Sequence, residues 1–85
     1  MAISSDQIDV LVNALINTRW VEQQMLGELA PADEVTYHMP TIMALREAAH
    51  AVGRVARSTE VYNGVGFASF TYRGVKFLAR DGRVA

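Results

Sequence analysis

The chain has 85 residues, of which 51% are hydrophobic, and its formal net charge is −1. This length suits one small domain, so we expect residues 1–85 to form a single domain around one core. The chain has no cysteine, which excludes disulfides and cysteine-ligated zinc or iron–sulfur centres. A domain of this size buries only about 60% of the surface of its unfolded chain, so good helix packing or self-association has to stabilise it.

The beginning of the chain does not resemble an export signal. The segment MAISSDQID has no basic region and already carries an acid, Asp6, whereas a secretory signal starts with basic residues. The most apolar run, from Val10 to Ile16, is interrupted by Asn13 and is far shorter than the roughly 18 residues of a membrane span. We therefore expect a cytoplasmic protein without a membrane partner.

Charged residues are divided unevenly along the chain. Residues 1–39 carry six acids and one base, whereas residues 40–85 carry seven bases and three acids. This asymmetry can serve an acidic partner, attraction between two copies, or neutralisation within one copy. The sequence leaves these three alternatives open.

A long first helix is predicted from about residue 5 to residues 27–30. Ser4 and Gln7 have the spacing of a capping box, and Ile3 and Ile8 have that of a hydrophobic staple. At 100° per residue, the apolar stripe of this helix contains Ile8, Leu11, Val12, Leu15, Leu26 and Leu29.

Trp20 lies away from this stripe, on the side of the helix that carries Asp9 and Asn13. Either the helix bends and its halves bury different faces, or it is contacted on two sides, by its own sheet and by a second copy or a partner. We favour the second interpretation, because large aromatic side chains are enriched in interface cores. Trp20, with Val21 and Met25, is therefore a candidate interface anchor, and core under a bent helix is the alternative.

Residues 30–40 are predicted to be a loop or one short helical turn, because Pro31 and Pro40 bracket them. A second helix is predicted over residues 40–58. Its alanine-rich apolar face consists of Ile42, Leu45, Ala48, Ala49, Val52, Val55 and Ala56.

A basic stripe is predicted on the opposite face of this second helix. Its members are separated by four, four and three residues, which places them on one helix face: Arg46, His50, Arg54 and Arg57. Such a stripe can bind phosphates, an acidic protein surface or an anionic ligand. The alternative is a solvated helix face, since basic residues late in a helix also interact favourably with its dipole.

The last third of the chain predicts an antiparallel meander. The dipeptides Asn63-Gly64, Arg73-Gly74 and Asp81-Gly82 are turn signals, and they separate strands at about 59–62, 65–72, 75–80 and 83–85. A two-residue turn at Arg73-Gly74 places Phe70 opposite Phe77 on an apolar face. We therefore predict an α+β fold in the order α-α-β-β-β, with two antiparallel helices packed on one face of a three- to four-stranded antiparallel meander.

The reverse face of this meander is more apolar than a solvated face requires. It carries Tyr62, Val65, Phe67 and Leu78, surrounded by Lys76, Arg80 and Arg83. An apolar centre with a polar rim is typical of a protein interface. The alternatives are coverage by the first helix or by the 30–40 segment, and a one-residue register slip that would exchange the two faces. The mixture of aromatic and basic residues also resembles, weakly, surfaces that stack single-stranded nucleic acid.

No residue pattern indicates catalysis, a cofactor or a metal. His38 follows Glu34 by four residues, but a metal site usually requires three or four protein ligands and no third is evident. The serines lack a nucleophile motif, and the glycines match no phosphate-binding loop. We expect a protein that is not an enzyme, has no catalytic residues and binds no cofactor or metal.

The sequence favours a small non-enzymatic interaction protein, a regulator or inhibitor that binds a surface of a larger protein or complex, as a homodimer. The candidate binding residues are basic or large apolar residues that we expect on the surface: Arg46, His50, Arg54, Arg57, Tyr62, Val65, Phe67, Leu78, Arg80 and Trp20. The alternative is a binder of a small anionic ligand or nucleotide through the basic helix face. Nucleic-acid binding is a third possibility.

Overall fold

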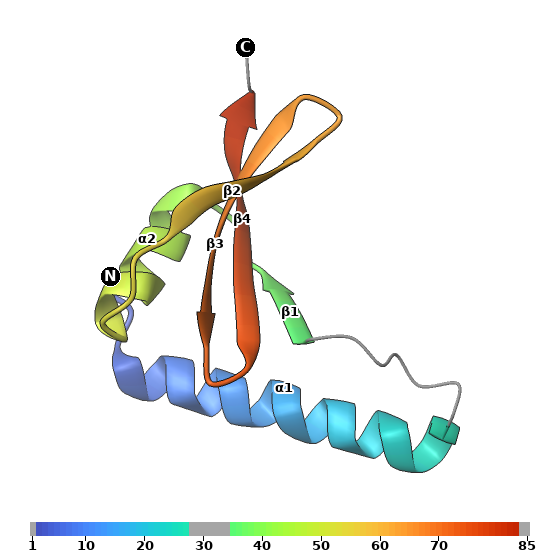
Figure 1. The fold of residues 1–85 in the computed structure, drawn as a ribbon. Helices are drawn as coiled ribbons and strands as arrows, with labels where there is room; N and C mark the ends of the chain where they lie inside the picture. Colours follow the sequence, from blue (N-terminus) through green and yellow to red (C-terminus); the bar gives the residue numbers. More distant parts are fainter. Residues whose placement is uncertain (1, 28–34, 84–85) are drawn as a thin grey trace.

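A computed structural model describes residues 2–27 and 35–83 as two helices and four strands. In chain order these are α1 (Ser5–Leu26), β1 (Val35–His38), α2 (Ile42–Ala51), β2 (Arg57–Tyr62), β3 (Val65–Tyr72) and β4 (Val75–Arg83). The strands form one sheet in the order β1-β4-β3-β2 (Figure 1). The predicted α+β class is therefore confirmed. Several predictions concern residues outside the described ranges: Leu29 in the helix stripe, the loop at 30–34, and residues 84–85 of the last strand.

The first helix begins where the capping signal placed it. The Ser4 hydroxyl accepts a hydrogen bond of 3.2 Å from the Gln7 backbone N–H, and the Gln7 side chain accepts one of 2.9 Å from the Ser4 N–H. These reciprocal bonds satisfy two of the free N–H groups at the helix start. In Figure 1 α2 runs obliquely to α1 instead of alongside it in the opposite direction, so the predicted antiparallel helix pair is wrong.

The second helix is shorter than predicted. It is capped by the Thr41 hydroxyl, which accepts a bond of 3.0 Å from Ala44 N–H, and it ends at Ala51 instead of residue 58. Gly53 follows with φ of +70°, a left-handed conformation that stops a helix and that glycine adopts without a steric penalty. The apolar periodicity continued beyond this glycine in the sequence, but residues 54–56 form an irregular connection to β2.

Residues 35–38 correct the prediction of a loop or helical turn. They form β1, which pairs in parallel with β4 from Val35 opposite Val75 to His38 opposite Leu78. Met39 continues the pairing, because its N–H donates a 2.7 Å bond to the Leu78 carbonyl. The sheet is therefore mixed, whereas a purely antiparallel meander was predicted.

The meander β2–β3–β4 forms in the predicted register. Phe70 lies opposite Phe77 and Ala68 opposite Ala79. Both residues of each connecting turn have positive φ, 51° and 76° at Asn63-Gly64 and 51° and 81° at Arg73-Gly74. This is the conformation of type I′ turns, whose twist matches that of paired strands.

The Asp81-Gly82 dipeptide is not a turn. β4 runs through it to Arg83, and the register shifts so that Gly66 faces Gly82 while Phe67 faces Arg80. Asp81 is the extra residue of a β-bulge, and Gly82 has φ of +99°. A glycine with positive φ suits a bulge as well as a turn, so the dipeptide alone could not distinguish them.

One core joins both helices to the same face of the sheet. Its buried members are Ile8 and Val12 of α1, Leu45, Ala48 and Ala49 of α2, and Ala68, Phe70, Val75, Phe77 and Ala79 of the sheet. Phe70 and Phe77 stack at 4.9 Å between ring centroids, and Tyr37 of β1 meets the Phe77 ring at 6.0 Å in an edge-on contact. The two phenylalanines are central, as the sequence predicted.

The molecule is a slab of one helix layer and one sheet layer, with extents of 42 × 33 × 17 Å. Because both helices pack on one sheet face, no described element covers the other. Neither described helix is both long and apolar enough to cross a bilayer.

Candidate interaction surfaces

The face of the sheet opposite the helices, here called the outer sheet face, has an apolar centre. Tyr62 of β2 lies opposite Val65 of β3, and Phe67 of β3 lies opposite Glu60 of β2. Leu78 lies on β4, an inner strand of the sheet. Leu78 is only 7% exposed although no described helix covers it, and it lies between His38 of β1 and Ser69 of β3. By contrast, Tyr62 on the same face is 58% exposed to solvent.

Aromatic and charged contacts order this outer sheet face. The Tyr62 ring meets Phe67 edge-on at 5.6 Å, and its hydroxyl donates a 3.0 Å bond to the Glu60 carboxylate. Glu60 also forms an ion pair with Lys76. Glu60 is therefore already engaged by two neighbours, so it contributes little free negative charge to the surface.

Arg57 and Arg80 lie on the same outer sheet face and are exposed. Within the described part of the chain, neither side chain has a hydrogen bond or an ion pair. The predicted rim residue Arg83 lies at the end of β4, but its side chain is outside the described part. The outer sheet face thus combines an apolar centre with two unpaired cations.

The predicted basic stripe is not a single helix face. Arg46 and His50 lie on α2 and are exposed, Arg54 lies in the connection that follows it, and Arg57 begins β2. Arg57 is on the outer sheet face, whereas Arg54 is on the helix side, close enough to lower the pKa of Tyr72 by its charge. The stripe is divided because α2 ends seven residues early, and the role of its members in binding stays a prediction.

Arg46 has a partner that the sequence did not indicate. Its guanidinium lies 3.9 Å from the carboxylate of Asp81, the bulge residue of β4, which also accepts a hydrogen bond from the Ser58 hydroxyl. Asp81 therefore lies on the helix side of the sheet, where it links α2 to β2 and β4.

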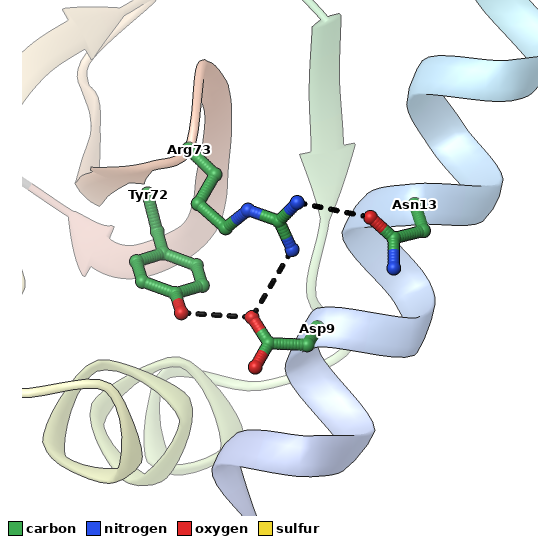
Figure 2. Close-up of polar contacts among 4 residues, drawn as sticks. All are labelled: Asp9, Asn13, Tyr72 and Arg73. Atoms are coloured by element: carbon green, nitrogen blue, oxygen red, sulfur yellow. Dashed lines mark hydrogen bonds and ion pairs between the residues drawn. The ribbon is translucent and has the colours of Figure 1, made fainter.

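A polar cluster that the sequence analysis missed joins α1 to the β3–β4 turn (Figure 2). The Tyr72 hydroxyl donates a 2.8 Å bond to the Asp9 carboxylate, which lies 3.3 Å from the Arg73 guanidinium. The second terminal nitrogen of Arg73 donates a 3.0 Å bond to Asn13. Asp9 and Asn13 are four residues apart and so share one helix face, and that spacing was the only local signal of this cluster.

The pKa of Tyr72 is raised above its ordinary value of 10.0 in this cluster. The hydrogen bond to Asp9 is the largest cause, followed by partial burial and by the negative charge of Asp9, while Arg73 and Arg54 act in the opposite direction. Because this pKa is raised, the hydroxyl keeps its proton and continues to donate its hydrogen bond to a higher pH than an ordinary tyrosine does. The cluster holds the hairpin against the helix.

Trp20 is 57% exposed on α1 and is not part of the described core. The alternative that placed it in the core under a bent helix is therefore wrong. Around it the second half of α1 carries Ile16, Val21, Met25 and Leu26, each at least 39% exposed. Within the described residues, no three histidine, aspartate or glutamate side chains gather in a way that could hold a metal ion.

Comparisons with known proteins add no relative: no family model, no curated protein and no solved structure matches this chain.

Proposed function

We propose that this chain is a small non-enzymatic interaction protein that binds a larger protein or protein complex through the outer sheet face, acting as a homodimer. The observation that carries the proposal is the composition of that face. No described helix covers it, its centre is apolar, and Arg57 and Arg80 beside this centre are exposed and have no side-chain partner among the described residues. Its action would be that of a regulator or inhibitor, which works by covering a surface.

The partner that fits this face is apolar at its centre and acidic at its rim. Half-buried Phe67 and exposed Tyr62 supply aromatic contact area, the kind of side chain that dominates interface energetics. Arg57 and Arg80 would meet carboxylates of the partner, and such complementary charges steer association and exclude wrong partners.

Charge reversal at Arg80 tests this proposal. The parent and the Arg80→Glu variant are used as bait to capture proteins from an extract of the source cells, and captured proteins are compared by mass spectrometry. We expect a partner that the parent retains and Arg80→Glu loses, because the reversed charge would repel an acidic rim.

Arg54→Glu is the matched control, since it reverses the same charge on the helix side of the sheet. It should retain the partner. Loss of the partner with Arg54→Glu but not with Arg80→Glu would contradict the proposal and favour the helix-side basic residues. Binding of single-stranded nucleic acid that survives moderate salt, with no protein captured, would also contradict it.

A further inference from the structure

We propose that two copies of this chain associate through the second half of α1, with Trp20 and Val21 nearest the twofold axis. This deepens the proposed function, because it names the face that joins the copies. That face is separate from the outer sheet face, so failure to dimerise would remove the homodimer from the proposed function but would leave partner binding through the outer sheet face to its own test at Arg80.

The second half of α1 extends beyond the elements that cover the first half. In Figure 1 the blue end of the helix lies near α2 and the β3–β4 turn, while the teal end continues past β1. The buried residues of α1, Ile8 and Val12, are both in the first half. From residue 16 onward, exposure of the large apolar side chains ranges from 39% at Val21 to 76% at Met25.

These side chains surround the helix instead of forming one stripe. Ile16 and Trp20 lie on one side, Val21 and Met25 on another, and Leu26 follows the line of the core residues. A solvated helix does not need large apolar side chains on several sides, so their presence here indicates a missing contact. The chain itself does not bury this segment among its described residues.

The total exposed area of the chain is larger than that of an average folded monomer of its size. The chain exposes 5957 Å², whereas a folded monomer of 9.4 kDa is expected to expose about 5000 Å². The excess of about 950 Å² is close to the roughly 800 Å² that each partner buries in a standard interface. The apolar residues of α1 supply part of that excess.

The charges of this segment favour a second copy as the occupant. Residues 16–26 contain one base and one acid, Arg19 and Glu22, whose side chains lie 3.8 Å apart in the same chain. The segment is therefore neutral, and it meets no repulsion from an identical segment. A twofold contact through the outer sheet face would instead bring the unpaired Arg57 and Arg80 of both copies together, which like charges oppose.

An antiparallel arrangement follows from the shape of the molecule. A closed dimer uses the same patch on both copies, and two projecting helix ends that cross antiparallel keep the two sheets apart at opposite ends. Residues in the middle of the segment then lie nearest the axis. Trp20 and Val21 occupy that middle, and an indole is the type of side chain found at the centre of interfaces.

The test uses Trp20 as its own probe, because the chain contains one tryptophan. Light scattering and tryptophan fluorescence are measured on the full chain over about a hundredfold range of concentration. We expect the mass to approach about 19 kDa, twice the 9.4 kDa of one copy, as mass action favours the dimer. Over the same range the emission should shift to the blue and acrylamide quenching should fall, because the indole becomes buried.

Met25→Glu places a charge in the proposed contact without touching the described core, and Trp20→Ala removes the central ring. We expect each to raise the dimer Kd at least about 30-fold, as loss of an interface hot spot does. Met43→Glu is the matched control, since Met43 is 65% exposed on α2, and it should dimerise like the parent. Arg80→Glu should also dimerise normally, which separates this proposal from the function of the outer sheet face.

Three results would overturn the proposal. The first is a mass of one copy and constant fluorescence at every concentration, which would leave the helix end for a different protein. The second is dimerisation of Met25→Glu as tight as that of the parent, with far-ultraviolet circular dichroism showing that the variant is folded. The third is dissociation caused by Met43→Glu alone, which would place the contact on α2.

Discussion

At the scale of single residues, Phe77 is the side chain on which the core depends most directly. It is fully buried, stacks on Phe70 at 4.9 Å and is met edge-on by Tyr37. It thereby links β1, β3 and β4, and a ring in such a position contributes both burial and aromatic contact.

Phe77→Ala should therefore lower the free energy of unfolding by about 3–5 kcal/mol, measured by urea denaturation. A chain of this length has roughly 4–13 kcal/mol in total, so the variant should be close to unfolding at room temperature. Val61→Ala, at a position that is 58% exposed, should change the stability by less than about 0.5 kcal/mol. Equal stability of Phe77→Ala and the parent would contradict the described core.

The Asp9–Tyr72 hydrogen bond predicts a dependence of stability on alkaline pH. Because the folded-state pKa of Tyr72 is raised above 10.0, the bond stabilises the fold at pH below about 10, the unfolded value, and this stabilisation is lost as pH rises through the folded pKa. Asp9→Asn removes the negative charge, so the Tyr72 pKa should fall toward 10.0, measured by the ultraviolet absorbance of tyrosinate.

Tyr72→Phe is the control for that titration, because it removes the contribution of Tyr72 and leaves those of Tyr37 and Tyr62. The difference between the parent and this variant gives the Tyr72 curve alone. If that curve lies at the same pH in the parent and in Asp9→Asn, Asp9 does not hold the hydroxyl.

At the scale of elements, the signals that succeeded were local. The capping box started α1 at the correct residue, and the dipeptides Asn63-Gly64 and Arg73-Gly74 set the register of β2, β3 and β4. No comparable signal marks β1 in the sequence, because this strand has only four residues and no tight turn connects it to the strand with which it pairs. Its hydrogen-bond partners are on β4, about forty residues later in the chain.

The capping box of α1 predicts the effect of a single hydroxyl. Ser4→Ala should lower the free energy of unfolding by about 0.5–2 kcal/mol, because it leaves the Gln7 N–H without its side-chain acceptor. Ser5→Ala is the matched control, since Ser5 is the exposed first residue of the helix. Thermal unfolding followed by circular dichroism measures both, and equal losses in the two variants would show that the cap does not stabilise the helix.

At the scale of the whole molecule, the slab shape produces the two candidate surfaces. The radius of gyration is 14.0 Å, whereas a compact domain of 85 residues is expected to have about 12 Å. When all the helices of a flat molecule pack on one face of its sheet, they leave the other face exposed. A helix that is longer than the small sheet on which it packs also has an exposed end. The tests at Arg80 and at Met25 address these two consequences separately.

The fold also explains part of the uneven distribution of charge along the chain. Asp9 belongs to the acidic half of the sequence and Arg73 to the basic half, and they form an ion pair within one copy. Among the described residues, three further ion pairs, such as Arg46 with Asp81, join residues of the same half. Neutralisation within one chain therefore occurs, whereas the Arg57 and Arg80 side chains have no acidic partner among the described residues.

The sequence by itself determined those features that depend on neighbours along the chain. Caps, type I′ turns and the alternation of strand 65–72 involve residues within a few positions of each other, so their signals are complete in a short window. The aromatic pair Phe70 and Phe77 followed from the turn between them.

Only the tertiary structure decided which distant segments meet. The parallel pairing of β1, the continuation of β4 through its bulge, the burial of Leu78 and the contact of Asp9 with Tyr72 join residues that are between about 10 and 63 positions apart. Each depends on free energy gained when separate elements pack, and that free energy is not encoded in the pattern of either element alone. Among the described residues, the same packing left the outer sheet face and the end of α1 uncovered, and these are the surfaces on which the proposals rest.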